Sequence, residues 1–128
     1  MAITMKKATP VLVVEAIEPC LDFWVRRLGF EVTIQVPHGD KLGFVALQSG
    51  PVEVMYQTQE SVASGTGSKT PLSRTMLYCD VADLEPVIEA LRGCEVVVPC
   101  RRAPYGADEI FVREPAGNII GFAAFPKG

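Results

Sequence analysis

The chain has 128 residues, of which 48% are hydrophobic and 21% charged, with a net charge of −3 and a pI near 5.1. Such values are typical of a globular domain, and they exclude the basic surface that binding to nucleic acid requires. No apolar run reaches the roughly 18 to 20 residues that cross a membrane, and the N-terminal residues lack the apolar core of a signal peptide. We therefore expect a cytoplasmic protein with neither a membrane nor a nucleic-acid partner.

The first half of the chain predicts a strand, a helix and three further strands. Residues 10–15 are apolar and β-branched, as in a strand. Apolar residues then recur from Leu21 to Leu28 at the spacing of one helix face, which makes Trp24 a core or dimer-contact residue. Gly29 is placed to end this helix. Three short strands separated by Pro- and Gly-containing turns follow at residues 31–36, 42–48 and 52–57.

A second copy of this order follows a connection rich in Ser, Thr and Gly. Residues 58–73 show no apolar period, so we expect a flexible connection that could also act as a lid. A strand, a helix with Asp83 as N-cap and Gly93 at its end, and three strands come next. These four strands are expected at residues 76–81, 95–100, 109–113 and 118–125.

The two halves are offset by about 64 to 68 positions, and an internal repeat of this length fixes the architecture. We predict a single α+β domain over residues 1–128. Module one covers about residues 9–57, a linker about 58–73, and module two about 74–125. The four cysteines are scattered and form no C-x-x-C pair, so we expect structural free thiols, with disulfides or zinc as alternatives.

The doubled β-α-β-β-β order resembles the vicinal oxygen chelate superfamily, which includes glyoxalase I, bleomycin resistance proteins and extradiol dioxygenases. The resemblance covers about residues 9–125 and includes Leu28-Gly29-Phe30 after the first helix and the turn Glu114–Asn118 before the last strand. Residues 43–57 and 105–118 are most similar to the bleomycin-resistance branch. The resemblance implies two modules whose mixed sheet curls into a cup, helices on the outer face, and a homodimer.

The metal enzymes of this superfamily bind their ion through side chains on the first and last strand of each module. Carried over by register, these positions are Thr9, Glu53, Met76 and Gly121. Only Glu53 is a strong ligand for a divalent metal, because Thr9 is a weak oxygen donor, Met76 a soft thioether, and Gly121 has no side chain. The single histidine, His38, is expected in a hairpin turn. We therefore expect no metal and no other cofactor.

Glu53 is the strongest remaining candidate for a functional residue. Strand alternation predicts that Glu53 and Met55 share the cup face, so Glu53 would be a carboxylate in a mostly apolar concavity. Burial raises the pKa of a carboxyl group unless a cation pairs with it. Three interpretations remain open: a structural pair with an arginine such as Arg74 or Arg113, an anchor for a cationic ligand, or an acid–base catalyst.

Aromatic and methionine side chains would complete a ligand-binding surface, since a binding cup needs flat apolar faces beside its polar anchor. The predicted ligand-binding residues share a place on candidate cup strands or their rims. They are Thr9, Phe44, Glu53, Met55, Met76, Tyr78, Tyr105 and Phe111.

Three hypotheses on function follow. The first, which we favour, is a metal-free small-molecule binding protein that sequesters an organic ligand, a cationic one being a candidate, and is similar to antibiotic-resistance proteins. The second is a lyase- or dioxygenase-like enzyme of the same superfamily, with an atypical or absent metal site and Glu53 as acid or base. The third is a structural or regulatory module whose cup is filled.

Overall fold

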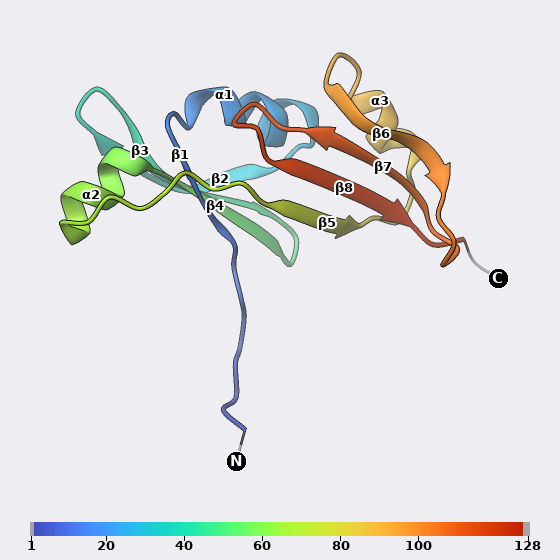
Figure 1. The fold of residues 1–128 in the computed structure, drawn as a ribbon, viewed down its shortest axis with the longest axis horizontal. Coiled ribbons are helices and arrows are strands. Elements are labelled where there is room, and N and C mark those ends of the chain that lie inside the picture. Colours follow the sequence, from blue (N-terminus) through green and yellow to red (C-terminus); the bar gives the residue numbers. More distant parts are fainter. Residues whose placement is uncertain (1, 127–128) are drawn as a thin grey trace. The chain divides into compact units, whose positions relative to one another are not determined.

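The computed structural model describes residues 2–126 and shows an α+β protein with two four-stranded mixed sheets and few helices (Figure 1). The first sheet has the strand order β1-β4-β3-β2 and the second β5-β8-β7-β6. The strands are β1 (Val11–Val14), β2 (Glu31–His38), β3 (Lys41–Ser49), β4 (Val52–Thr58), β5 (Met76–Asp80), β6 (Glu95–Arg102), β7 (Asp108–Arg113) and β8 (Ile119–Ala124). The helical segments are α1 (Glu18–Leu21), the π-helical η1 (Asp22–Arg27), α2 (Gln59–Thr66) and α3 (Glu85–Ala90).

The repeat predicted from the sequence is present in the pairing of the strands. In each sheet the first strand of the module pairs in parallel with its last strand, as β1 does with β4 and β5 with β8. The remaining pairs are antiparallel and come from neighbouring strands of the chain. The α+β class and the doubled β-α-β-β-β order are therefore confirmed.

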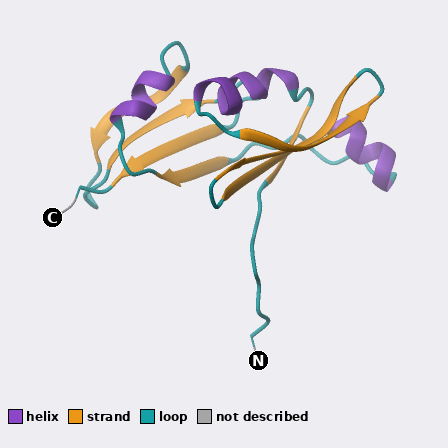
Figure 2. Ribbon diagram, turned by 180° about the vertical axis from the view of Figure 1, so that it is seen from behind, coloured by secondary structure: helices purple, strands orange, loops and turns teal. Residues whose placement is uncertain are grey.

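The chain divides into two compact units that do not coincide with the two halves of the sequence. The first contains the residues up to Ile17 and Phe30–Leu72, and the second contains Glu18–Gly29 and the residues from Ser73 onward. The helix of the first module thus belongs to the unit of the second sheet, where α1 and α3 lie on one side of that sheet (Figure 2).

Two side-chain contacts tie this helix into the second unit. The thiol of Cys20 lies 3.8 Å from Oε2 of Glu114, and Arg27 Nη1 donates to the carbonyl oxygen of Ala90 at 3.1 Å. Cys20 and Glu114 are both buried. Because these partners lie more than sixty residues away along the chain, local sequence patterns carry no sign of them.

The first helix buries a different face from the one that was predicted. Cys20, Phe23 and Trp24 are its buried residues, whereas Leu21 and Leu28 are only half-buried. The cause is the π-helical stretch, in which the amide of Leu28 donates to the carbonyl of Phe23 at 3.3 Å. The wider turn breaks the 3.6-residue period on which the prediction relied. Trp24 is confirmed as a core residue.

The connection between the modules contains a helix that the prediction did not include. The side chain of Thr58 caps α2 by accepting from the amide of Ser61 at 3.1 Å, and Gly67 ends the helix at φ +76°. Helix α2 buries no residue, so no apolar period marks it. The cap and the terminal glycine were the available signals.

Two smaller expectations also need correction. Helix α3 begins after Leu84 without a side-chain cap, so Asp83 is not its N-cap; Pro86 in the first turn marks the start instead. None of the four cysteines forms a disulfide; Cys20 is buried, as a structural thiol would be, but Cys100 is exposed near the end of the outer strand β6.

Candidate functional site

One face of the first sheet carries three of the predicted ligand-binding residues. Along β4, Val54 and Tyr56 are buried while Glu53 and Met55 are half-buried, which confirms the predicted alternation. The register places Phe44 of β3 opposite Gln57, on the same face as Glu53 and Met55.

Glu53 is paired within the first unit. Its Oε1 atom forms an ion pair with Lys7 Nζ and accepts a hydrogen bond from the Thr9 hydroxyl at 3.3 Å. Lys7 first and Thr9 second hold the pKa of Glu53 below its usual value, against the opposing effect of desolvation. Glu53 is thus an ionised, partnered carboxylate whose cation is Lys7 rather than an arginine. Arg113 instead binds Glu95 at 3.0 Å.

On the second sheet, an aromatic row crosses one face. Tyr78, Gly121 and Phe111 are directly opposite one another on β5, β8 and β7. The Tyr78 and Phe111 rings lie 6.1 Å apart, and the Phe111 ring occupies the space above Gly121. Met76 precedes this row on β5 and is exposed. The structure therefore brings together three predicted residues, Tyr78, Phe111 and Met76, on one face.

Glu109 on β7 is the polar centre of this face, although it was not among the predicted site residues. Its side chain is 0% exposed. Oε2 accepts hydrogen bonds from Tyr105 at 2.5 Å and Tyr78 at 2.7 Å, and Oε1 accepts one from Arg101 Nη2 at 3.1 Å. The available signal was alternation, which puts Glu109 on the face of Phe111, but its partners appear only once the strands are paired.

These hydrogen bonds set the charge of the cluster. Tyr105 first, then Tyr78 and Arg101, hold the pKa of Glu109 below its usual value, so the buried carboxyl group is ionised. The same contacts with Tyr105 and Glu109 raise the pKa of Tyr78, so its hydroxyl keeps its proton. Tyr105 also packs against Phe125, with the ring centres 6.4 Å apart.

The side chains at the four metal positions of the superfamily do not fit a metal ion. In the first unit, Glu53 is already paired with Lys7. In the second unit, Gly121 has no side chain, and a Cβ there would lie 2.4 Å from the Phe111 ring. Within residues 2–126, no group of three or more His, Cys, Asp or Glu side chains could hold a metal ion. His38 ends β2, where its Nε2 atom lies 3.6 Å from the Glu60 carboxylate.

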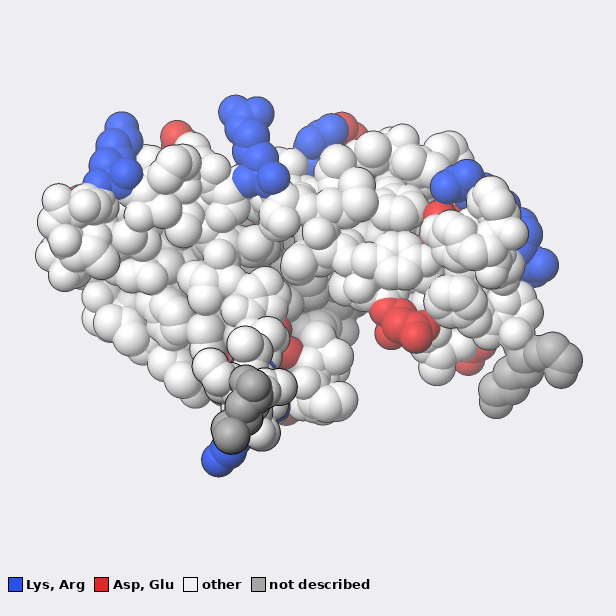
Figure 3. All heavy atoms as spheres, turned by 60° about the horizontal axis from the view of Figure 1, so that its bottom comes forward, with Lys and Arg blue, Asp and Glu red and all other residues white. Residues whose placement is uncertain are grey.

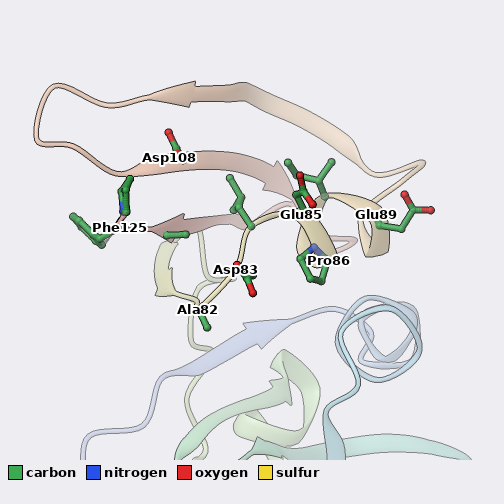
Figure 4. Close-up of a pocket in the computed structure, with 11 residues that line it drawn as sticks. Ala82, Asp83, Glu85, Pro86, Glu89, Asp108 and Phe125 are labelled. Carbon is green, nitrogen blue, oxygen red and sulfur yellow. The ribbon is translucent and has the colours of Figure 1, made fainter. Parts of the chain in front are cut away.

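A cavity of about 1060 Å³ lies elsewhere in the second unit, between α3 and the ends of β7 and β8 (Figure 4). Its acidic side chains are Asp83, Glu85, Glu89 and Asp108. Two of these are paired, Asp108 with Arg102 and Glu89 with Arg92. The acidic side chains of this cavity are exposed or half-buried, and none of them is buried as Glu109 is.

The surface adds two general observations. On the face seen in Figure 3, the Lys and Arg side chains are separated by uncharged surface and form no continuous patch. Among the described residues, no helix is both long and apolar enough to span a bilayer.

Comparison with known families identifies the fold. The family described as Glyoxalase/Bleomycin resistance protein/Dioxygenase superfamily matches residues 7–122. The chain belongs to this superfamily. No curated protein matches it by sequence.

Solved structures of the superfamily share the fold at low sequence identity. A glyoxalase/bleomycin resistance protein/dioxygenase from Nocardioides has a TM-score of 0.78 and 20% identity, over 99% of this chain and 88% of that one. TioX from Micromonospora sp. ML1 has a TM-score of 0.77 and 18% identity, over 95% of this chain and 100% of that one. A bleomycin-binding protein from Streptomyces verticillus, solved with copper(II)-bleomycin, has a TM-score of 0.65 and 24% identity, over 98% and 100%.

Proposed function

We propose that this superfamily member binds a small organic molecule, without a resident metal ion, on the open face of the second sheet. The observation that carries the proposal is the aromatic face held by Glu109. The Tyr78 and Tyr105 side chains are 47% and 59% exposed, although their hydroxyls are fixed on a fully buried carboxylate. These rings therefore present apolar area to solvent in a fixed position.

This arrangement suits ligand binding for a physical reason. Association costs free energy for each flexible side chain that must be ordered. Here the hydrogen bonds to Glu109 and the packing of Tyr78 on Phe111 have already ordered the rings. The rings supply apolar area and the cluster supplies a small number of fixed polar groups, which is the usual composition of a ligand site.

The first sheet offers a second candidate surface of the same kind. Glu53 and Met55 share its half-buried face with Phe44, and Thr9 and Lys7 bind Glu53. In our proposal this face contributes to binding through the methionine and aromatic side chains. Glu53 is a weaker anchor for a cationic ligand on this face, because its carboxylate already pairs with Lys7.

The catalytic alternative, with Glu53 as acid or base, has less support. The lowered pKa of Glu53 leaves it ionised at neutral pH, so it cannot donate a proton as a general acid. The same low pKa makes it a weak base. The filled-module alternative is opposed by the exposure of Tyr78, Tyr105 and Met76.

A thermal-shift screen of an organic ligand library, run on protein purified without added metal, tests the proposal. A ligand present at 100 times its Kd should stabilise the fold by about 2.7 kcal/mol. Tyr78→Ala should abolish the shift, and the matched surface variant Glu60→Gln should retain it. Near-stoichiometric transition metal by plasma mass spectrometry, or ligand shifts insensitive to Tyr78→Ala, would contradict the proposal.

We also propose a cytoplasmic homodimer, as the resemblance to the superfamily implies. Light scattering of the purified protein measures the mass directly. A mass of one chain across the micromolar range would rule out the dimer.

A further inference from the structure

The hydroxyl groups of the Glu109 cluster have a fixed direction, which sets what they can offer a ligand. A tyrosine hydroxyl has one proton to donate and lone pairs that accept. Tyr105 and Tyr78 both donate to Oε2 of Glu109, at 2.5 Å and 2.7 Å. Tyr78 is also within reach of the Tyr105 oxygen as a donor, at the longer distance of 3.4 Å. Because the contacts with Oε2 are the shorter ones, the two protons point mainly to the carboxylate, and lone pairs on both phenolic oxygens remain for a ligand.

We propose that Tyr78 and Tyr105 form a paired acceptor that selects ligands bearing a positively charged N–H donor, such as a primary ammonium or amidinium group. The inference rests on the proposed function and names the ligand class for that site. The ammonium or amidinium protons bond to the two phenolic oxygens, and the apolar part of the ligand packs on the neighbouring rings.

Charge and ring geometry support the same ligand class. The ionised Glu109 lies directly behind the two hydroxyls, and hydrogen bonds that pass through a hydroxyl to a carboxylate strengthen the outer acceptor. The faces of aromatic rings also attract cations. Each tyrosine ring has an aromatic neighbour, Phe111 beside Tyr78 and Phe125 beside Tyr105.

Arg101 is the cation of the cluster, and it could favour an anionic ligand instead of a cationic one. Its Nη2 atom binds Oε1, whereas the tyrosines bind the other carboxylate oxygen. Its side chain is 51% exposed, so solvent screens its charge more than that of Glu109, which is 0% exposed. An anionic ligand could bind only to the N–H groups of Arg101 that do not contact Glu109. The experiment therefore includes an anionic probe.

A purely structural role for the cluster would be to hold the turn that carries Tyr105. That turn is already closed by its own backbone, because the amide of Ala103 donates to Ala107 at 2.7 Å and that of Gly106 donates to Ala103 at 2.9 Å. The Tyr105 hydroxyl is therefore free to serve a purpose besides closing the turn. A structural role would also leave ligand selectivity unchanged when the hydroxyls are removed.

Four matched probes test the proposal by NMR titration of the tyrosine ring resonances: benzylammonium, benzyl alcohol, benzoate and trimethylbenzylammonium. Benzylammonium should bind most tightly, about tenfold tighter than benzyl alcohol, because hydrogen bonds to charged groups are the stronger ones. Trimethylbenzylammonium keeps the charge but has no N–H, so it should bind more weakly than benzylammonium. Benzoate should bind least.

Variants then test which side chains cause the selectivity among these probes. The double variant Tyr78→Phe with Tyr105→Phe keeps both rings and should remove the preference for benzylammonium over trimethylbenzylammonium. Glu109→Gln should change the tyrosine pair from an acceptor into a donor. The amide N–H donates to one tyrosine oxygen, and the proton of that hydroxyl can then turn toward the ligand. Glu60→Gln, an equal change of charge at an exposed site, should behave as the parent protein.

The outcomes distinguish this inference from the proposed function. Benzyl alcohol or benzoate binding as tightly as benzylammonium would overturn the selectivity while leaving small-molecule binding intact. Unchanged selectivity in the double Phe variant, with the fold verified by circular dichroism, would also overturn it. No binding by any of the four probes, together with an empty ligand screen, would overturn both.

Discussion

A Cβ atom at position 121 would lie 2.4 Å from Cε2 of Phe111, so the glycine makes room for that ring. The resemblance to the superfamily implies that this position corresponds to a metal-binding side chain in its metal enzymes. Here the space belongs to an aromatic ring, which in turn packs against Tyr78. The absence of a side chain at position 121 thus lets the Phe111 ring pack against Tyr78 and form the aromatic face.

Gly121→Ala should destabilise the protein by about 1 to 3 kcal/mol, because the added methyl group overpacks a buried site. Urea unfolding measures the change. Gly65→Ala in α2 is the control: no atom lies within 4 Å of the position that its Cβ would take, and alanine favours a helix by about 0.5 to 1 kcal/mol. Adding Phe111→Leu to Gly121→Ala should recover part of the loss; equal stability of Gly121→Ala and the parent protein would refute the close contact.

Lys7→Met should raise the pKa of Glu53 toward the ordinary value, because Lys7 is the main cause of its lowering. A folded-state pKa below the unfolded one stabilises the protein above the unfolded value, about 4.3, and this contribution disappears as the pH falls through the folded pKa. The stability of the variant should therefore decrease less as the pH falls through this range. Carboxyl-carbon NMR titration checks the shift, and Lys41→Met is the control; an unmoved Glu53 pKa would exclude the pair in solution.

Tyr105→Phe should lower the pKa of Tyr78, because the hydrogen bond with Tyr105 is the largest cause of its rise. In the parent protein Tyr78 should stay protonated beyond about pH 10, the ordinary range of tyrosine. A raised folded-state pKa means that the stabilisation is present below the unfolded pKa and is lost as the pH rises through the folded one. Near-ultraviolet absorbance titration follows the three tyrosines. Ordinary titration of Tyr78 in the parent would contradict this geometry.

The thiols should react in the order of their exposure. Cys100 is exposed and should react first with a chromogenic disulfide, whereas Cys20 is fully buried and should react only on unfolding. Burial raises the pKa of Cys79 from 9.0 to about 11, which lowers its thiolate fraction about a hundredfold at neutral pH. Mass spectrometry of peptides labelled over time gives the order, and rapid labelling of Cys20 in folded protein would contradict it.

The sequence by itself determined the order of the strands and, in β4, the face of each side chain. The alternation of Glu53 and Met55 with Val54 and Tyr56 was legible because a half-buried strand has a strict two-residue period. The repeat could be predicted because it depends only on the order of residue types along the chain. Helix α2 was missed because it buries no residue and so leaves no period.

Only the tertiary structure decided which distant residues meet. The first helix joins the unit of the second sheet through Cys20 and Glu114, 94 positions apart. Glu109 collects Tyr78, Tyr105 and Arg101 from two other strands and a turn, and Glu53 takes Lys7 as its partner rather than an arginine. Such contacts depend on strand order and register, and a one-residue change in the register of β4 or β7 would turn Glu53 or Glu109 to the opposite face.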